Sequence, residues 1–481
     1  MNAYLIVLFV LVAGLLAVSL TRLHTVKTGA DFLVAGRSLS AGVLVFTLLS
    51  SWIGAGSLFA GAENAYRNGM ASLWQPAGGW VGLLIIYFVA PRARKFAQFT
   101  IPDLLETRYG VATRVLAMIA IILAYTAITS YQFKGGGDIL ALITGVTPGQ
   151  GTAIIAAFVI VFTALAGMSS IAYVDLVIGL SVTVILIAAV PVLLHHAGGW
   201  ATVRASLPAN HFQVLGPLSI WQAMGYFLPV FLLMLGNQSM YQKFFSAKSE
   251  KDARRAVIGW VIGTIVLETI IIVIAVIGSA LFHGAPDLKP REIIPYTARH
   301  GLPALLGAIL MGAIFAKVIS TGNNYLFSPA TNIVNDIYSR FINPKASNRQ
   351  VLLVSRTIVV LLGLFAFAQT FQDSILTVML YAYTVYSAAI TPVVMAAFFW
   401  KRATGRGAVW SVSLGTVVTV GWNVIPKLPL PMAFSPMVHL MTNMDAIYPA
   451  VLISMAALVF ISLATPPPTR AQLAPFAEAA S

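Results

Sequence analysis

The sequence contains no cysteine, and only 9% of its 481 residues are charged. Without cysteine there are no disulfides, no thiolate metal sites and no cysteine nucleophiles. The scarcity of charge, with a hydrophobic content of 59% and a mean hydropathy of +0.88, excludes an ordinary soluble domain. The composition therefore predicts an all-α polytopic membrane protein, with the lipid bilayer as its surroundings.

About thirteen apolar runs are candidates for transmembrane helices. The first run is expected to be retained as a helix, because it lacks the basic n-region and the small-residue cleavage site of a signal peptide. The predicted spans cover residues 1–20, 40–62, 72–91, 114–144, 151–167, 173–195, 219–239, 254–281, 302–332, 351–370, 376–400, 407–424 and 446–464.

Basic residues give the chain a formal charge of +14 at pH 7. Twenty-one of the 29 lysines and arginines fall in one set of alternating loops, and six fall in the opposite set. Since cytoplasmic loops carry the excess of Lys and Arg, we expect the N-terminus outside and the C-terminus in the cytoplasm, in the plasma (inner) membrane. The run of basic residues from Lys243 to Arg255 is expected to be a solvated cytoplasmic face. This topology accounts for the charge, so no nucleic-acid partner is expected.

Two apolar runs are interrupted by residues that suit a continuous lipid-facing helix poorly. The run 40–62 contains the sequence SSWIGAGS at 50–57, and the run 219–239 contains Pro229 and the sequence GNQS at 236–239. Glycine and serine loosen a helix where hydrocarbon makes unpaired backbone groups costly, so such breaks are tolerated only against protein or a polar cavity. Paired breaks in two halves of a chain predict the binding site of a transporter.

Several ionisable residues lie within or at the start of predicted spans. Lys134 and Asp138 share one helix face, so they either neutralise each other or leave Lys134 to meet an anionic group of a substrate. Asp175 begins the sixth predicted span, and Glu268 lies in the middle of the eighth. Ionisable groups inside a membrane are functional candidates by default.

The predicted span 302–332 contains the densest polar cluster, AKVISTGNN at 316–324. Hydroxyls and backbone carbonyls are hard oxygen ligands of the kind that suit sodium. A lone serine would more simply bond back to the preceding helical turn, but a run this long, with Lys317 three residues before Ser320, disfavours that interpretation. We therefore expect a cation site at Ser320 and Thr321.

Six short motifs, in order over nearly the whole chain, carry a family resemblance. They are GRSL at 36–39, RYG at 108–110, YVD at 173–175, QKFFSAKS at 242–249, ST at 320–321 with DIY at 336–338, and WKRAT at 400–404. In this order they resemble the sodium:solute symporter family, whose members share the leucine-transporter (LeuT) fold. The resemblance implies ion-coupled symport of a small organic solute by alternating access. It implies sodium as the coupling ion. We expect no other cofactor and no obligate protein partner, and we expect no enzymatic activity because the sequence holds no soluble catalytic constellation.

The implied fold is a LeuT-type 5+5 inverted repeat whose first and sixth core helices are discontinuous. Its expected parts are a peripheral first helix and linker (1–39), a first repeat (40–195), an external loop (196–218), a second repeat (219–400), two peripheral helices (401–465) and a cytoplasmic tail (466–481).

The resemblance also implies the ligands of a sodium ion. Backbone carbonyls near Ser51 and Gly54 would bind the ion together with the hydroxyls of Ser320 and Thr321. In the family a further carbonyl comes from the position three residues before the first hydroxyl, and that position is Lys317 here.

Lys317 leaves two alternatives open. Either its side chain leans away to a structural partner while its carbonyl helps to bind sodium, or its ammonium group, or a proton cycling on and off it, takes the place of sodium. Asp175 is the first candidate partner of this ammonium group, and Glu268 is the second.

The positions that would contact a solute follow from the same resemblance. They are Ser57, Trp74, Gln75, Lys134, Asn237 and Tyr383. Helix-end dipoles and the charge of Lys134 would favour a carboxylate-bearing solute.

The competing functional class is a channel or a transporter-derived sensor. An intramembrane hydrolase would need an activated nucleophile, and Ser320 has no His or Asp near it in the sequence.

Overall fold

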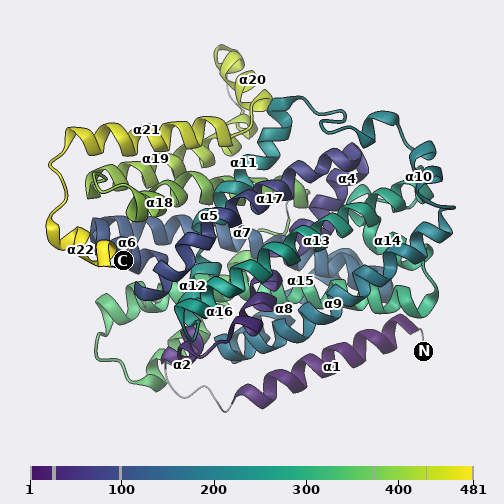
Figure 1. The fold of residues 1–481 in the computed structure, drawn as a ribbon, viewed down its shortest axis with the longest axis horizontal. Coiled ribbons are helices and arrows are strands. Elements are labelled where there is room, and N and C mark those ends of the chain that lie inside the picture. Colours follow the sequence, from purple (N-terminus) through teal and green to yellow (C-terminus); the bar gives the residue numbers. More distant parts are fainter. Residues whose placement is uncertain (1–2, 24–28, 97–99, 372–373, 430, 479–481) are drawn as a thin grey trace.

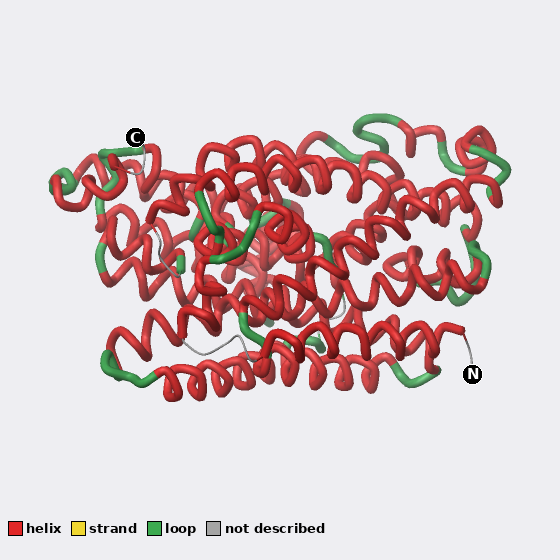
Figure 2. Tube along the Cα trace, turned by 60° about the horizontal axis from the view of Figure 1, so that its bottom comes forward, coloured by secondary structure: helices red, strands yellow, loops and turns green. Residues whose placement is uncertain are grey.

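The computed structural model describes residues 3–23, 29–96, 100–371, 374–429 and 431–478. Within these ranges the chain is almost entirely helical and contains no β-strand, as Figures 1 and 2 show. Eleven helices of the described part are long and apolar enough to cross a membrane, and the two remaining predicted spans contain the shorter apolar helices Ala3–Val18 and Ala41–Trp52. The prediction of an all-α polytopic membrane protein is confirmed.

The helices follow one another along the chain with short connections. They are α1 (Ala3–Leu23), α2 (Gly29–Val34), α3 (Ala41–Trp52), α4 (Ala62–Asn68), α5 (Trp74–Phe96), α6 (Ile101–Tyr109), α7 (Val111–Thr144), α8 (Pro148–Leu165), α9 (Met168–His196), α10 (Trp200–Ser206), α11 (Ile220–Gly236), α12 (Gln238–Ser246), α13 (Glu250–Phe282), α14 (Ile293–His300), α15 (Ala304–Asn332), α16 (Asn348–Ala368), α17 (Ile375–Ala389), α18 (Thr391–Phe399), α19 (Gly405–Val424), α20 (Ser435–Asn443), α21 (Ile447–Ala464) and α22 (Arg470–Glu478). Short 3-10 and π-helical turns add η1 (Ala35–Arg37), η2 (Gly56–Gly61), η3 (Gly69–Leu73), η4 (Ala209–Phe212), η5 (Pro290–Glu292), η6 (Ile333–Ile342), η7 (Ile425–Lys427) and η8 (Met432–Phe434).

The first predicted break lies where α3 ends. Ile53 has an extended backbone (φ −81°, ψ 109°), and the chain becomes helical again only in the π-helical turn η2. Gly54 is required at this point, because a Cβ atom there would lie 2.6 Å from Oγ1 of Thr321. The side chain of Gln132 on α7 accepts a hydrogen bond of 2.8 Å from the backbone N–H of Ala55. A backbone donor freed by the break is therefore bonded inside the protein.

The second predicted break separates α11 from α12. Asn237 leaves the helical conformation (φ −65°, ψ 114°), and its side chain caps α12 by accepting a hydrogen bond from the N–H of Met240. The hydroxyl of Tyr386 accepts a bond from the N–H of Gln238 and donates one to the carbonyl of Gly236. Both predicted interruptions are confirmed. A further one, at Ile390 between α17 and α18, divides the run predicted at 376–400.

The helix α15 forms the centre of the molecule. It packs against α7, α9 and α8, and almost every residue from Gly307 to Asn332 is buried. In Figure 1, α1 lies along one edge of the bundle, where it packs on α15 and α9, while α19 and α21 pack together along the opposite edge. The polar cluster predicted at 316–324 therefore lies in the protein interior and not toward lipid. The boundaries of the two repeats stay a prediction.

Candidate ion and substrate site

The hydroxyl of Thr321 is surrounded by backbone oxygens from two helices. Its Oγ1 lies 2.8 Å from the carbonyl oxygen of Ser50, 3.0 Å from that of Ile53 and 3.0 Å from that of Lys317. Two of these carbonyls belong to the end of α3, where the break removes them from a regular helix. Oxygens that converge in this way suit a hard cation such as sodium.

The two carbonyls from α3 are those of Ser50 and Ile53, one residue before each of the predicted positions, Ser51 and Gly54. The hydroxyl of Ser51 donates to the carbonyl of Thr47 within α3. The carbonyl of Gly54 accepts the N–H groups of the next helical turn, at Ser57 and Leu58, so it is already bonded. Gly54 contributes close packing against Thr321 instead.

Ser320 points to a different partner from its neighbour. Its hydroxyl donates a very short hydrogen bond to the carboxylate of Asp175 on α9. The same carboxylate accepts bonds from Oγ1 of Thr47 at 2.5 Å and from the side-chain amide of Asn324 at 3.1 Å. Asp175 is fully buried, and these donors stabilise its charged form.

Lys317 reaches this network through Ser50. Its Nζ donates to Oγ of Ser50 at 3.0 Å, and that hydroxyl donates to the backbone carbonyl of Asp175 at 3.1 Å. Among the described residues no direct ion pair joins Lys317 to Asp175, so the predicted pairing is corrected to a contact through Ser50. Glu268, the second predicted partner, bonds to residues in a different part of the site.

A second buried lysine enters the same network from α12. Nζ of Lys243 donates to Oδ1 of Asn324 at 2.8 Å and to the hydroxyl of Ser239 at 3.1 Å. Asn324 thus connects Lys243 to the carboxylate of Asp175. The prediction that Lys243 belongs to a solvated cytoplasmic face is wrong, because its side chain is completely buried. The network contains two ammonium groups and one carboxylate.

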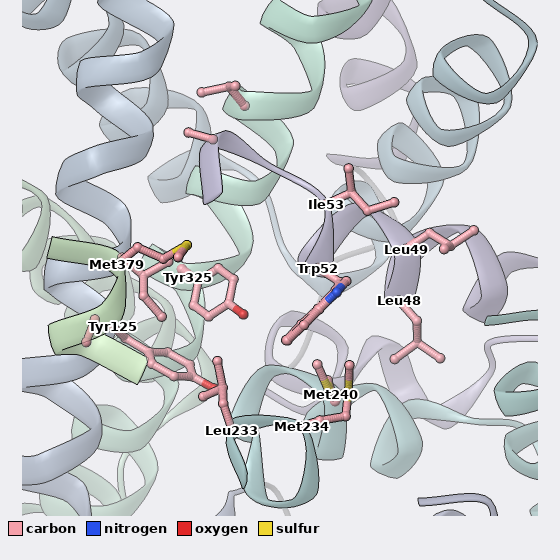
Figure 3. Close-up of a cluster of buried hydrophobic side chains, with 14 of the residues drawn as sticks. Leu48, Leu49, Trp52, Ile53, Tyr125, Leu233, Met234, Met240, Tyr325 and Met379 are labelled. Atoms are coloured by element: carbon pink, nitrogen blue, oxygen red, sulfur yellow. The ribbon is translucent and has the colours of Figure 1, made fainter. Parts of the chain in front are cut away.

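Glu268 forms the centre of a second polar cluster, at the break in the first core helix. One carboxylate oxygen accepts bonds from the indole N–H of Trp52 at 3.0 Å and from the hydroxyl of Ser57 at 3.3 Å, and the other accepts the indole N–H of Trp80 at 3.0 Å. Trp52 also stacks on Tyr383, with ring centroids 6.3 Å apart. Figure 3 shows Trp52 projecting from the end of α3 into the interior, near Met234 and Met240.

Three of the predicted substrate residues meet around this cluster. Ser57 and Gln75 line one small cavity with Glu268, and Tyr383 reaches the cluster by stacking on Trp52. The tryptophans that hold the carboxylate were not predicted as site residues. Trp52 is part of the SSWIGAGS sequence and could have been found from that, whereas nothing in the sequence distinguishes Trp80 from the other tryptophans.

The other predicted substrate residues have different surroundings. Trp74 donates its indole N–H to the carbonyl of Val214 at 2.9 Å, beneath the loop that precedes α11. Asn237 caps α12 and is bonded to the hydroxyls of Tyr125 and Tyr325, so its side chain maintains the second break. Lys134 lies on α7, half-buried, four residues before Asp138.

Asp138 forms an ion pair that the sequence did not indicate. Its carboxylate lies 3.0 Å from Nε of Arg291, which follows it by 153 residues. The carboxylate that was expected to neutralise Lys134 therefore has a cationic partner from the turn η5, and the two roles weighed for Lys134 stay a prediction.

A family model matches most of this chain. The model of the sodium:solute symporter family covers residues 32–415. The chain belongs to the sodium:solute symporter family. Curated relatives include the high-affinity proline transporter PutP of Bacillus subtilis (strain 168), which is 26% identical over 424 residues, covering 82% of this chain and 86% of the relative. The sodium/proline symporter of Staphylococcus aureus is 23% identical over 419 residues, covering 82% of this chain and 80% of the relative.

Solved structures of symporters share the fold of this family member. A Na+-coupled sialic acid symporter, solved in a substrate-bound outward-open state, matches with a TM-score of 0.81 and 16% identity over 98% of this chain and 99% of its own. Mhp1, a transporter of the nucleobase-cation-symport-1 family, matches with a TM-score of 0.59 and 13% identity, covering 93% of this chain and 98% of its own. The LeuT-type fold implied by the motifs is confirmed.

Proposed function

We propose that this chain is a secondary transporter that couples the movement of a small organic solute across the membrane to a cation, with sodium as the coupling ion. The observation that carries the proposal is the set of oxygens around Thr321, from the end of α3 and from α15. Two curated relatives, a high-affinity proline transporter and a sodium/proline symporter, support a solute of amino-acid size.

The position of these oxygens suggests how the cation is coupled to movement. Carbonyls of Ser50 and Ile53 come from the broken helix, whereas Thr321 and Ser320 come from α15. A cation bound between them would hold the two helices together, and its release would leave them free to separate. The hydroxyl of Ser320 donates its hydrogen to Asp175, which leaves the lone pairs of its oxygen for a cation.

A second candidate rests on the ammonium group of Lys317. Because this group is buried and bonded to Ser50 beside the same carbonyls, it offers an internal positive charge where sodium would bind. In that case the transporter is coupled to protons or works without an ion gradient.

The stability of the purified protein in nanodiscs tests the proposal, because a ligand that binds only the folded state raises stability by about 2.7 kcal/mol at 100 times its Kd. Sodium would replace potassium at constant ionic strength. We expect the wild type to be stabilised by sodium, and the Ser320→Ala/Thr321→Ala double variant to lose this response. Thr419→Ala, which removes a buried hydroxyl on the peripheral helix α19, is the control and should keep it.

The alternatives give different results in this titration. Equal sodium responses in the wild type and the double variant would remove the proposed ion site. A response confined to Lys317→Ala would identify the lysine as the resident cation.

The multi-pass topology completes the proposal. We propose that the chain lies in the plasma (inner) membrane with its N-terminus outside and its C-terminus in the cytoplasm, as the distribution of Lys and Arg supports.

A further inference from the structure

We propose that Glu268 binds the positively charged amine of the transported solute, so that the solute is an amine or an amino acid and not a simple carboxylate. This inference rests on the proposed transport function. Three observations support it. They are the hydrogen bonds that the carboxylate of Glu268 accepts, the lack of a cationic side chain paired with it among the described residues, and the cavity that adjoins it.

The hydrogen bonds around Glu268 fit an ionised carboxylate. An indole N–H can only donate, and the carboxylate accepts one such bond at each of its two oxygens, from Trp52 and Trp80. The hydroxyl of Ser57 supplies a third donor. A proton on the oxygen that faces Trp80 would oppose the indole N–H, and a proton on the other oxygen would require the Ser57 hydroxyl to accept instead of donate. The hydrogen bonds as they stand are therefore those of an ionised carboxylate.

This charge has no cationic side chain beside it. Among the described residues, no Lys, Arg or His forms an ion pair with Glu268, whose exposed fraction is 5%. Two other buried carboxylates do have such partners: Asp138 pairs with Arg291, and Asp336 pairs with Arg114 at 2.6 Å. Asp175 is connected to the ammonium group of Lys243 through Asn324. A buried charge without an opposite charge is costly, so the site gains when a cation from outside binds there.

A small cavity adjoins the carboxylate on the side of the first break. It is lined by Ser57, Gly61, Gln75, Pro76, Glu268, Ile271 and Ile272, and its volume of about 10 Å³ has room for about one water molecule. An amine nitrogen is of similar size. Aromatic rings lie close by, since Trp52, which donates to the carboxylate, is stacked on Tyr383.

The expected solute therefore needs an amine, and a carboxylate alone is not sufficient. A solute with a carboxylate as its only charged group would place a second negative charge next to Glu268, in surroundings where water screens it little. An amino acid remains compatible, because its amine can bind Glu268 while its carboxylate points away from this residue.

Three five-membered-ring compounds of nearly equal size test the inference on the purified wild-type protein in nanodiscs with sodium. Pyrrolidine carries only the amine, L-proline carries the amine and a carboxylate, and tetrahydrofuran-2-carboxylate carries only the carboxylate. We expect saturable thermal stabilisation by at least one of the two amine-bearing compounds, and none by the third. This comparison needs no variant, so it does not depend on how a substitution folds.

Variants then locate the effect. Glu268→Gln should weaken binding of the stabilising amine by about 10- to 100-fold, since it removes a charge-assisted bond. Glu268→Asp keeps the charge and should lose less. Glu63→Gln removes a carboxylate that pairs with Arg67 on α4 and should bind as the wild type does.

Three results would overturn the inference. One is stabilisation by tetrahydrofuran-2-carboxylate equal to that by L-proline. Another is the absence of any response to both amines in protein that still responds to sodium, which leaves the proposed ion coupling intact. The last is a sodium response that disappears in Glu268→Gln, which would make Glu268 a ligand of the inorganic cation. If sodium does not stabilise the wild type at all, the result would instead count against the proposed function itself.

Discussion

The ammonium group of Lys317 donates a hydrogen bond of 3.0 Å to the hydroxyl of Ser50. The backbone carbonyl of the same serine lies 2.8 Å from the Thr321 hydroxyl, among the oxygens proposed to bind sodium. The side chain of Ser50 therefore bonds to the lysine, while its main-chain carbonyl belongs to the proposed cation site. A sodium ion at this site would lie close to a second positive charge.

Removal of that charge should strengthen sodium binding. In Lys317→Ala we expect stabilisation by sodium to begin at a concentration at least about tenfold lower than in the wild type, because like charges a few ångströms apart repel by several kcal/mol even where screening is moderate. Thermal unfolding across a sodium titration measures this shift. Lys427→Ala, at an exposed position, should leave the titration unchanged. Weaker sodium binding in Lys317→Ala would mean that the side chain assists the ion instead of repelling it.

Gly54→Ala should damage the proposed cation site through packing alone. The added Cβ atom would lie 2.6 Å from Oγ1 of Thr321, so α3 and α15 would have to move apart. We expect a loss of stability of about 1–3 kcal/mol and no stabilisation by sodium. Gly42→Ala on the same helix is the matched control, because no atom lies within 4 Å of its new Cβ. If both variants respond to sodium alike, the break does not form the ion site.

Glu106 on α6 should contribute stability that depends on pH. Burial raises the pKa of this carboxyl, but bonds to Arg114 and Arg340 outweigh it and hold the pKa below its usual value. A lowered pKa stabilises the folded state above the ordinary glutamate value of about 4.3, and this contribution is lost as the pH falls through the folded-state pKa. The Tm difference between the wild type and Glu106→Gln should therefore be largest near neutral pH and shrink on acidification. A difference that grows at low pH would contradict this assignment.

The absence of native cysteine allows the topology to be tested with single introduced cysteines. Lys345→Cys and Lys427→Cys lie at exposed positions in loops predicted to be on opposite sides of the membrane. In intact cells a membrane-impermeant maleimide should label Lys427→Cys and leave Lys345→Cys unlabelled until the membrane is opened. The reverse pattern would invert the proposed orientation.

The helix breaks could be predicted from the sequence because their cause is local. Glycine, serine and asparagine in the middle of an apolar run predict an interrupted helix at 50–57 and 236–239 without knowledge of any partner. The break at Ile390 has a comparable local signal in Pro392, which follows it by two residues. The cation site proposed at Ser320 and Thr321 is likewise predicted from local composition.

The contacts between distant residues could not be predicted in the same way. Asp138 and Arg291 are 153 residues apart, and a helix-face rule considers only neighbours such as Lys134. Lys243 was assigned to a solvated face because it precedes several basic residues, although its helix α12 lies wholly inside the protein. The surroundings of Glu268 depend on Trp80, which only the packing of α5 on α13 brings near.

The side-chain hydrogen bonds at the helix breaks also affect the rate of any conformational change that moves the broken helices. Gln132 bonds the N–H of Ala55 from α7, while Tyr386 and Tyr125 bond the first two N–H groups of α12 from α17 and α7. Any movement that separates the broken helices from these neighbours must break such bonds. Each one still broken at the top of the barrier adds about 1 kcal/mol to it, which slows the step about fivefold. In the proposed transport cycle, the residues that complete the broken helices would therefore slow any step that separates these helices from α7 and α17.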